Sequence, residues 1–249
     1  MVRSTREYVY GINPAFEVVR AGRRKVYTAY LNAATPDNPR LRKLSAILEK
    51  RDIAVEWVGR QRLFELSRSK EHQGAVLKTQ VYPYASLTDL MGRPRLVLLD
   101  NVEDPNNVGG ILRSAEVFGF DGVLLPVKGV PDIYPSVTKV SAGATEHLDI
   151  VKETSANKYV KTASAFGYVV IALDAAGKMD VNELSGLDVE KLLLVIGGED
   201  RAVGQLILNT ADHVVGIHQR GRINSLNASV AAGIALFTLG RKPRASVRP

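Results

Sequence analysis

Residues 95–118 read RLVLLDNVEDPNNVGGILRSAEVF. Residues 95–100 form a nearly continuous apolar run, and residues 109–118 repeat apolar side chains at helical spacing. A strand without polar alternation is typical of a parallel sheet that is covered by helices on both faces. This stretch therefore predicts an α/β fold in which a buried strand is followed by a loop and a helix.

The same pattern recurs through the rest of the chain. Further apolar runs predict strands at residues 122–127, 168–174, 192–197 and 213–217, and helical spacing predicts helices at about 156–166, 205–210 and 225–239. Ligands of parallel sheets bind at the carboxyl ends of the strands. The loops after these strands are therefore the places to look for a functional site.

The N-terminal residues predict a second, smaller α/β unit. Strands are expected at residues 26–31 and 53–58, with helices at 41–51 and 61–67. A stretch with two prolines and a glycine follows, which is typical of a linker. We therefore expect a domain over residues 1–80, a linker over 81–94 and a parallel-sheet domain over 95–249.

Positive charge is concentrated in the N-terminal third of the sequence. Residues 1–80 contain 16 Lys and Arg against 8 Asp and Glu, whereas the whole chain has a net charge of +7. A basic module of this kind is typical of a protein that binds a polyanion such as nucleic acid. A solvated basic face that keeps the protein soluble explains the charge equally well.

The composition narrows the functional class. With 249 residues, 45% of them hydrophobic, the chain predicts a globular protein with a sizeable core. It contains no cysteine, which excludes disulfides and thiol nucleophiles, and we expect no metal. Dinucleotide fingerprints, phosphate-binding loops and nucleophile elbows are missing from the sequence. No apolar stretch is long enough for a membrane span or a secretory signal, so we expect a cytoplasmic protein.

Two polar residues follow the strand at 95–100. Asn107 lies near the expected start of the next helix, and Arg113 lies six residues further on. An amide and a guanidinium beside the free N–H groups of a helix start suit a phosphate or a ribose hydroxyl. An asparagine that caps the helix and an arginine that extends into solvent explain the same residues.

Two later loops contain residues that also allow both a functional and a purely structural explanation. Gly198 follows a buried strand and exposes bare backbone to a ligand, or serves a turn for conformational reasons. Glu199 is placed to pair with an arginine or to be a solvated turn residue. Ser225 and Asn227 flank the start of the last helix, where capping is the simpler explanation.

Taken together, the three loops resemble the three ordered motifs of the SpoU (TrmH) family of RNA ribose 2′-O-methyltransferases. The matching positions are residues 104–109 with Arg113, residues 196–199, and residues 225–227 followed by Ala231. The resemblance covers about residues 95–239. Residues from Tyr10 to the His72-Gln73-Gly74 stretch are similar to the ribosomal-protein-like substrate-binding domain of the family. Within the family the chain is most similar to the RlmB branch, which methylates a guanosine ribose in 23S rRNA.

The resemblance implies a particular fold, cofactor and assembly. The parallel-sheet domain would be of the SPOUT type and contain a deep trefoil knot, an exception to the rule that chains do not thread loops. S-Adenosylmethionine would bind in the knot, held by the backbone around Gly198, Ile217 and Leu226. Members of the family are homodimers with the active site near the subunit interface.

The resemblance also assigns catalytic roles to Asn107, Arg113, Glu199, Ser225 and Asn227. Arg113 would orient the 2′-hydroxyl and its phosphate, because a guanidinium stays protonated near neutral pH and is no free base. Glu199 would orient Arg113 or an arginine of the second subunit. The other three would fix the loop geometry and the nucleophile.

The sequence departs from the family pattern near the expected cofactor site. His218 stands where the family usually has proline, after the residue that corresponds to Ile217. Asp200 and Ala202 stand where a glycine is usual. Because proline fixes φ and glycine permits positive φ, both departures bear on the shape of the cofactor loops.

An RNA substrate requires cations on the surface. We expect phosphate contacts from Arg20, Arg23, Arg24 and Lys25, with Arg60 and Arg62 as further candidates. The leading interpretation is methylation of a guanosine ribose in large-subunit 23S rRNA. The alternatives are ribose methylation of tRNA, a ribosome-assembly factor that binds RNA without catalysis, and a metabolite-binding α/β enzyme. The last of these leaves the N-terminal charge unexplained.

Overall fold

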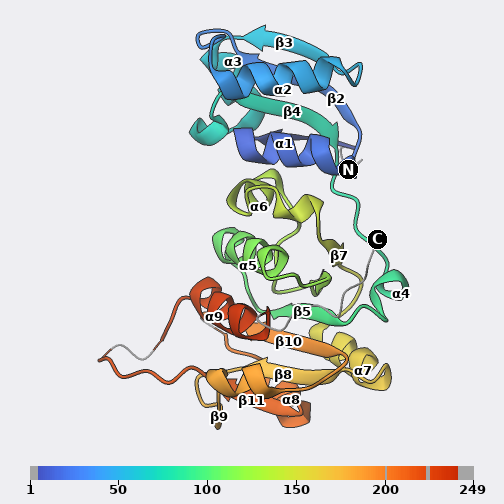
Figure 1. Ribbon diagram of the computed structural model, residues 1–249, viewed down its shortest axis with the longest axis vertical. Coiled ribbons are helices and arrows are strands. Elements are labelled where there is room, and N and C mark those ends of the chain that lie inside the picture. Colours follow the sequence, from blue (N-terminus) through green and yellow to red (C-terminus); the bar gives the residue numbers. More distant parts are fainter. Residues whose placement is uncertain (1–4, 200, 223–224, 241–249) are drawn as a thin grey trace. The chain divides into compact units, whose positions relative to one another are not determined.

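The computed structural model describes residues 5–199, 201–222 and 225–240, which form two compact units (Figure 1). The first unit contains the residues up to 83 together with residues 133–147, and the second contains 84–132 and the residues from 148 onward. The break after residue 83 falls within the linker expected at 81–94. Part of that stretch is nevertheless folded, since helix α4 (Leu87–Leu90) ends in the fully buried Leu90.

The first unit is built on a four-stranded sheet with the order β1-β4-β2-β3. Its strands are β1 (Arg6–Tyr10), β2 (Val26–Asn32), β3 (Ala54–Val58) and β4 (Ala75–Gln80), and only the β2–β3 pair is parallel. Helices α1 (Ile12–Ala21) and α2 (Pro39–Glu49) share one core with the sheet, and α3 (Arg60–Ser67) contributes Leu63 to another. Because successive side chains of a strand point to opposite faces, the two cores lie on opposite faces of the sheet.

Residues 133–147 join this unit although they lie between two strands of the second unit in the chain. They form helix α6 (Pro135–Val140), which packs on β1, and the short helix η2 (Ala144–Glu146), which packs on α1. Gly143 between them has a φ of +93°, and a Cβ there would lie 2.7 Å from Cβ of Glu17. Glycine is required at this position for both reasons. The sequence pattern assigned these residues to the 95–249 domain, so their place here is a finding of the structure.

A buried ion-pair cluster of Arg24, Glu7 and Glu146 fastens this segment. The Arg24 side chain has no exposed surface; Nη2 donates to Glu146 Oε1 at 2.5 Å, Nε donates to Oε2 at 3.0 Å, and Nη1 pairs with Glu7. The expectation that Arg24 contacts RNA phosphates is therefore wrong. Its charge is neutralised by two carboxylates, one of them 122 residues away in the sequence.

The second unit is a seven-stranded sheet with the order β7-β6-β5-β10-β8-β11-β9, in which every pair is parallel. Its strands are β5 (Arg95–Asp100), β6 (Gly122–Leu124), β7 (Asp149–Val151), β8 (Val169–Leu173), β9 (Met179–Asp180), β10 (Leu192–Gly197) and β11 (His213–Gly216). The predicted parallel sheet is confirmed, and the bounds of β5 and β10 agree with the sequence pattern. The strand expected at 122–127 is shorter, and β7 and β9 were not expected.

Helices cover both faces of this sheet, as the apolar strands require (Figure 1). Helices α7 (Ala156–Ala165) and α8 (Gln205–Thr210) share a core with Leu96, Leu98, Leu193 and Val195. Helices α5 (Pro105–Val117) and α9 (Ala228–Gly240) pack against each other, and α9 also contacts β10. Helix η3 (Val181–Gly186) packs against α9. None of the helices within the described residues has the length and apolar character needed to cross a membrane.

Candidate active site

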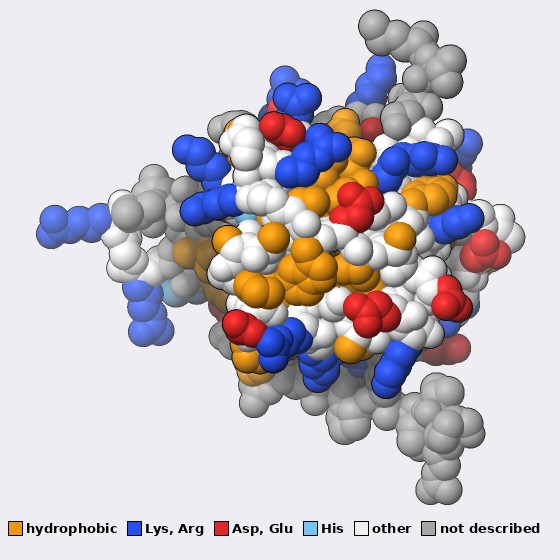
Figure 2. Space-filling view, turned by 90° about the horizontal axis from the view of Figure 1, so that it is seen from above, with side chains coloured by type: hydrophobic (Ala, Val, Ile, Leu, Met, Phe, Trp, Pro, Cys, Tyr) orange, Lys and Arg blue, Asp and Glu red, His pale blue; other side chains and the backbone are white. Residues whose placement is uncertain are grey.

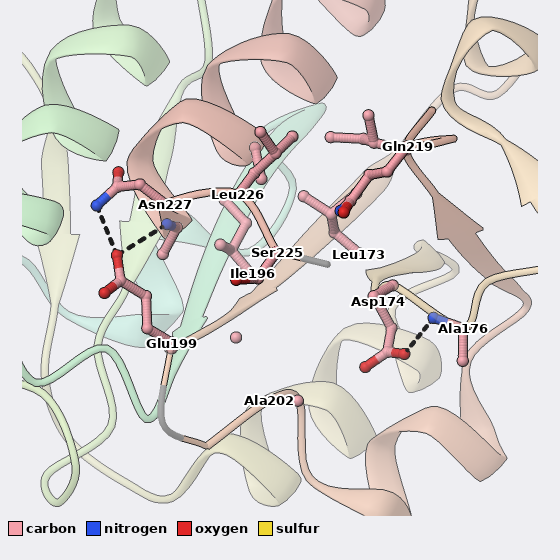
Figure 3. A pocket seen from close by; sticks show the side chains of 16 residues that line it. Leu173, Asp174, Ala176, Ile196, Glu199, Ala202, Gln219, Ser225, Leu226 and Asn227 are labelled. Carbon is pink, nitrogen blue, oxygen red and sulfur yellow. Dashed lines mark hydrogen bonds between the residues drawn. The ribbon is translucent and has the colours of Figure 1, made fainter. Parts of the chain in front are cut away.

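A cavity of about 540 Å³ opens at the carboxyl ends of β8 and β10 (Figure 3). Four loops line it: residues 173–176 after β8, 196–199 with 202 after β10, 217 and 219 after β11, and 225–228 with 231 at the start of α9. Apolar side chains such as Leu173, Ile196 and Leu226 share the wall with polar ones. The cavity therefore lies at the edge of the sheet where the sequence placed the site.

Three polar side chains form a hydrogen-bonded group at the rim of this cavity, here called the rim cluster. Glu199 Oε1 accepts from Asn227 Nδ2 at 2.5 Å and from the backbone N–H of Ala228 at 3.3 Å (Figure 3). It also accepts from Asn107 Nδ2 at 3.1 Å. Asn227 Nδ2 also donates to Asn107 Oδ1 at 2.8 Å. Hydrogen bonds to a carboxylate are strong. The rim cluster therefore holds together α5, the loop after β10 and the start of α9.

The other end of the Asn227 amide caps helix α9. Its Oδ1 accepts from the backbone N–H of Ser229 at 3.0 Å and of Val230 at 3.3 Å, and from the Ser229 hydroxyl at 2.6 Å. These backbone groups have no partner within the helix, so the side chain satisfies them. The capping explanation and the loop-fixing role thus both apply to Asn227.

Asn107, in contrast, is not a helix cap. Helix α5 begins two residues earlier, at Pro105, and the Asp104 side chain caps it by accepting from the backbone N–H of Asn106 at 2.9 Å. Proline is suited to the first helical position because its φ is already helical. The helix start expected near Asn107 is corrected accordingly. The Asn107 side chain is buried and bonds to Glu199 and Asn227.

Gly198 is explained by the close approach of the neighbouring strand end. A Cβ on this residue would lie 2.0 Å from the carbonyl oxygen of Asn101, while its N–H donates to the Asp100 carbonyl at 3.1 Å. The Asp100 side chain, 8% exposed, accepts from the backbone N–H of Gly204 at 2.9 Å. Asp100 thus positions two loops of the site. Sequence reasoning did not single it out, although a polar residue at the end of a buried strand is a usable signal.

Of the five expected catalytic residues, four lie together and one does not join them. Asn107, Glu199 and Asn227 form the rim cluster, and Ser225 lines the cavity. Arg113 is exposed on α5, is not among the lining residues, and has no hydrogen bond or ion pair with any residue in the described part of the chain. The expected pairing of Glu199 with Arg113 is absent among these residues, because the carboxylate is bonded to two asparagines and Ala228 instead.

The three residues expected to hold the cofactor, Gly198, Ile217 and Leu226, all line the cavity. Among the positions that depart from the family pattern, Ala202 lines it too. His218 is exposed and borders a neighbouring cavity of about 490 Å³. Asp200 lies outside the described residues.

Two further lining residues escaped the sequence interpretation. Asp174 follows β8, and its Oδ1 accepts from the backbone N–H of Ala176 at 2.9 Å; Gln219 lies in the loop after β11 (Figure 3). Asp174 is the last residue of one predicted strand and Gln219 follows another, so the rule that directs attention to the carboxyl ends of parallel strands would have found both.

The basic residues of the first unit are spread over its surface. Arg20 is exposed and pairs with Glu17 at 2.6 Å, Lys25 is exposed and lies over the ring of Tyr27, and Arg23 is half-buried. Figure 2 shows Lys and Arg side chains around an apolar area, with Asp and Glu between them. Within the described residues, no three His, Asp or Glu side chains are grouped so that they could hold a metal ion.

Models of two protein families match the chain. The model described as "SpoU rRNA Methylase family" matches residues 94–237, and the model described as "RNA 2'-O ribose methyltransferase substrate binding" matches residues 8–85. The chain belongs to the SpoU rRNA methylase family. As a member of this family it is an RNA methyltransferase, and the family resemblance drawn from the three loops is confirmed.

Two relatives at about 30% identity carry related names. A putative TrmH family tRNA/rRNA methyltransferase of Bacillus subtilis, YacO, is 30% identical over 243 residues, which cover 95% of this chain and 96% of that protein. A Mycolicibacterium gilvum protein named as an uncharacterized tRNA/rRNA methyltransferase is 33% identical and covers 96% of this chain and 78% of its own.

Solved structures of the family share the fold. The SpoU methyltransferase AviRb from Streptomyces viridochromogenes, crystallised in complex with AdoMet, is 26% identical, with a TM-score of 0.78 over 96% of this chain and 91% of that one. A second structure, described as an RNA 2′-O ribose methyltransferase, is 22% identical with the same TM-score over 94% of this chain and 88% of that one, and shows likeness of fold.

Proposed function

We propose that the protein transfers a methyl group from S-adenosylmethionine to the 2′-hydroxyl of a guanosine ribose in 23S rRNA. The observation that carries this proposal is the meeting of the three family motifs at one cavity, where Glu199 binds Asn107 and Asn227. The basic first unit, which matches a substrate-binding family model, supports RNA as the substrate. We further propose that this activity resides in the cytoplasm.

The cavity fits S-adenosylmethionine in size and chemistry. A volume of about 540 Å³ lies within the range of small-molecule sites. Leu173, Ile196 and Leu226 offer apolar surface to an adenine ring, and the backbone at Gly198 and Ile217 offers hydrogen-bonding groups. When bound, the cofactor supplies a methyl group on a positively charged sulfur, which is already electrophilic.

The residues of the chain then position the RNA. Arg113 is exposed and unpaired among the described residues, so it is free to bind a phosphate and orient the 2′-hydroxyl. The hydroxyl proton leaves to a neighbouring oxygen, since a guanidinium does not accept it. Ser225 offers a hydroxyl at the cavity wall, and the rim cluster keeps the loops in place. Holding the reacting atoms in line accounts for much of the rate enhancement.

A homodimer is part of this proposal. Helix α9 is apolar on all sides, and Val230 and Phe237 on it are half exposed, as is Val117 on α5. The two helices pack together, so these side chains belong to one helix pair. A second copy of the chain that covers them removes this apolar surface from water.

We also propose that the second unit contains the deep trefoil knot of the family. Strand β10 lies between β5 and β8, although both precede it in the chain, and the motif loops return to one edge of the sheet. Such a threaded path is compatible with the close backbone approach at Gly198.

The test is methyl transfer with identification of the product. The protein is incubated with labelled S-adenosylmethionine and unmodified 23S rRNA or tRNA, and the methylated nucleoside is identified after digestion. We expect 2′-O-methylguanosine from 23S rRNA, lost in Arg113→Ala and retained in the matched surface variant Lys161→Ala. Methylation of tRNA alone would overturn the rRNA assignment. No transfer to either RNA by folded protein would favour an assembly factor without catalysis.

A further inference from the structure

The first unit contains a cavity of its own, of about 440 Å³, where helix α3 meets the short helix η1 (Lys70–His72). It is lined by Arg60, Gln61, Phe64, Lys70 and His72. Arg60 and Phe64 are four residues apart on α3, so they lie on the same face of the helix. An aromatic ring, two cations and two side chains with hydrogen-bonding groups thus share one hollow.

The cations of this cavity are free to bind a ligand. Neither Arg60 nor Lys70 forms an ion pair or a hydrogen bond with any residue that the structure describes, whereas the nearby Arg62 pairs with Glu65 at 3.3 Å. Phe64 is 39% exposed, although its neighbour Leu63 is completely buried. The cavity therefore presents an accessible aromatic side chain beside two cations that have no protein partner among these residues.

His72 adds a hydrogen-bond donor in a fixed orientation. The residue is only 4% exposed, and its Nδ1 accepts from the backbone N–H of Gly74 at 3.0 Å. Burial, together with the charge of Arg60, lowers the pKa of His72 and keeps the ring neutral. With Nδ1 as acceptor, the proton of the neutral ring is on Nε2. Among the described residues Nε2 has no hydrogen-bond partner, and the atom is accessible to solvent, so this N–H is open to a molecule in the cavity.

We propose that this cavity is a recognition subsite for an unpaired nucleotide of the substrate RNA. The base stacks on Phe64, His72 Nε2 donates to an acceptor on its edge, and Arg60 and Lys70 contact the flanking phosphates. Single-stranded RNA is bound in this way, by aromatic platforms beside cations that follow the backbone. The subsite binds the nucleotide and takes no part in methyl transfer. It rests on the proposed function in that RNA is taken as the substrate.

The experiment measures binding of the full-length protein to a short, fluorescently labelled single-stranded RNA of mixed sequence, by anisotropy. Phe64→Leu, which keeps an apolar side chain without the ring, should weaken binding about tenfold, and Phe64→Trp should restore it. His72→Asn keeps an acceptor for Gly74 and removes the Nε2 donor, so it should weaken binding severalfold. The same RNA annealed to its complement should show no dependence on residue 64.

The cations are tested against a pair of equal charge on another helix. Arg60→Ala/Lys70→Ala should weaken binding and reduce the slope of log Kd against log salt by about 1.4, the value for two phosphate contacts on a single strand. Lys43→Ala/Lys50→Ala removes the same charge from exposed positions on α2 and directly after it, and should stay within about twofold of the unmodified protein. Equal losses in the two double variants, or unchanged binding by Phe64→Leu, would overturn the subsite.

Methyl transfer measured on the same variants separates the two proposals. If the unmodified protein transfers no methyl group while RNA binding still depends on Phe64, the proposed function fails and the subsite stands. If it methylates RNA and Phe64→Leu binds and reacts as well as the unmodified protein, the subsite fails and the function stands. Loss of RNA affinity on changing Arg60 and Lys70 but not Phe64 would mean that the cavity contacts only phosphates, and would refute nucleotide stacking.

Discussion

The buried ion-pair cluster of the first unit and the rim cluster of the second have a similar construction and different consequences. The bonded side chains are 17 and 122 residues apart in the buried ion-pair cluster, and 28 to 120 residues apart in the rim cluster. In the first, the side chains of Arg24 and Glu146 have no exposed surface and pair with each other, and Arg24 also pairs with Glu7. In the second, Glu199 and Asn227 remain exposed and border a cavity.

The difference lies in what surrounds the charges. In the buried ion-pair cluster, every charged group is directed at another group of the chain, so it serves to hold residues 133–147 in place. In the rim cluster, amides and one carboxylate set the shape of loops whose other side faces the cavity. A charged residue is therefore a guide to function only after its partners and its exposure are known. Arg24 and Arg113 illustrate the point, since the sequence predicted an RNA contact for Arg24 and a catalytic role for Arg113, and only Arg113 is exposed.

Removing Arg24 should have the largest effect. Arg24→Ala leaves Glu146 as a buried charge without its main partner, which should lower the free energy of unfolding by about 3–5 kcal/mol. Urea unfolding followed by circular dichroism measures this. Arg20→Ala, which breaks an exposed pair with Glu17, should cost no more than about 1 kcal/mol. If the two changes lower the free energy of unfolding equally, the burial of Arg24 is not the cause of its contribution to stability.

Glu199→Ala should have the next largest effect, and chiefly on binding. The change leaves the Asn107 and Asn227 amides without their shared acceptor, and hydrogen bonds to a charged group contribute about 1.5–3 kcal/mol each. We expect affinity for S-adenosylmethionine, measured by calorimetry, to fall about tenfold as the loops lose their positions. Glu103→Ala, an exposed carboxylate on the loop after β5, serves as the control. Undiminished affinity in Glu199→Ala would show that the rim cluster does not contribute to cofactor binding.

The two roles of Asn227 separate in a pair of variants. Asn227→Ala removes both the cap of α9 and the bond to Glu199, and should lower stability by about 1 kcal/mol. Asn227→Ser keeps a capping hydroxyl but loses the amide donor, so stability should recover while cofactor affinity stays low. Thermal unfolding and calorimetry report the two quantities. If serine fails to restore stability, capping is not the source of the effect.

The smallest effect is a pH dependence in the buried ion-pair cluster. Burial raises the pKa of Glu7 above its ordinary value of 4.5, and outweighs the lowering by Arg24. The folded state then holds this proton more tightly than the unfolded state, so stability falls as pH rises from about 4.5 through the folded pKa. Glu7→Gln should show less of this decline in unfolding experiments over that range. An unchanged pH profile in Glu7→Gln would contradict the raised pKa of Glu7 as the cause of the decline.

The sequence predicted most of what depends on local pattern. The apolar runs of β5 and β10 gave their bounds correctly, because a strand covered on both faces has no polar positions to obscure it. The sequence predicted which residues form the rim cluster, but it did not predict the hydrogen bonds between them. Sequence spacing indicates that Asn107, Glu199 and Asn227 reach one edge of the sheet, but hydrogen bonds among them depend on side-chain directions that spacing does not encode.

Long-range packing accounts for what was missed. Nothing in the sequence around Glu146 indicates that this residue pairs with Arg24. The two residues are 122 positions apart, and a contact over such a distance produces no periodic pattern in the sequence. The cavity at Arg60, Phe64 and His72 was missed for the same reason. Its members come from two short helices whose patterns identify only the buried Leu63.

The placement of residues 133–147 has an evolutionary consequence. A unit that depends on two separate stretches of one chain cannot be exchanged between proteins as a single cassette. Recombination that delivered only the stretch up to residue 83 would deliver Arg24 without Glu146. The two stretches are therefore bound to be inherited together, and a change at either end of the ion pair constrains which residues the other end can accept.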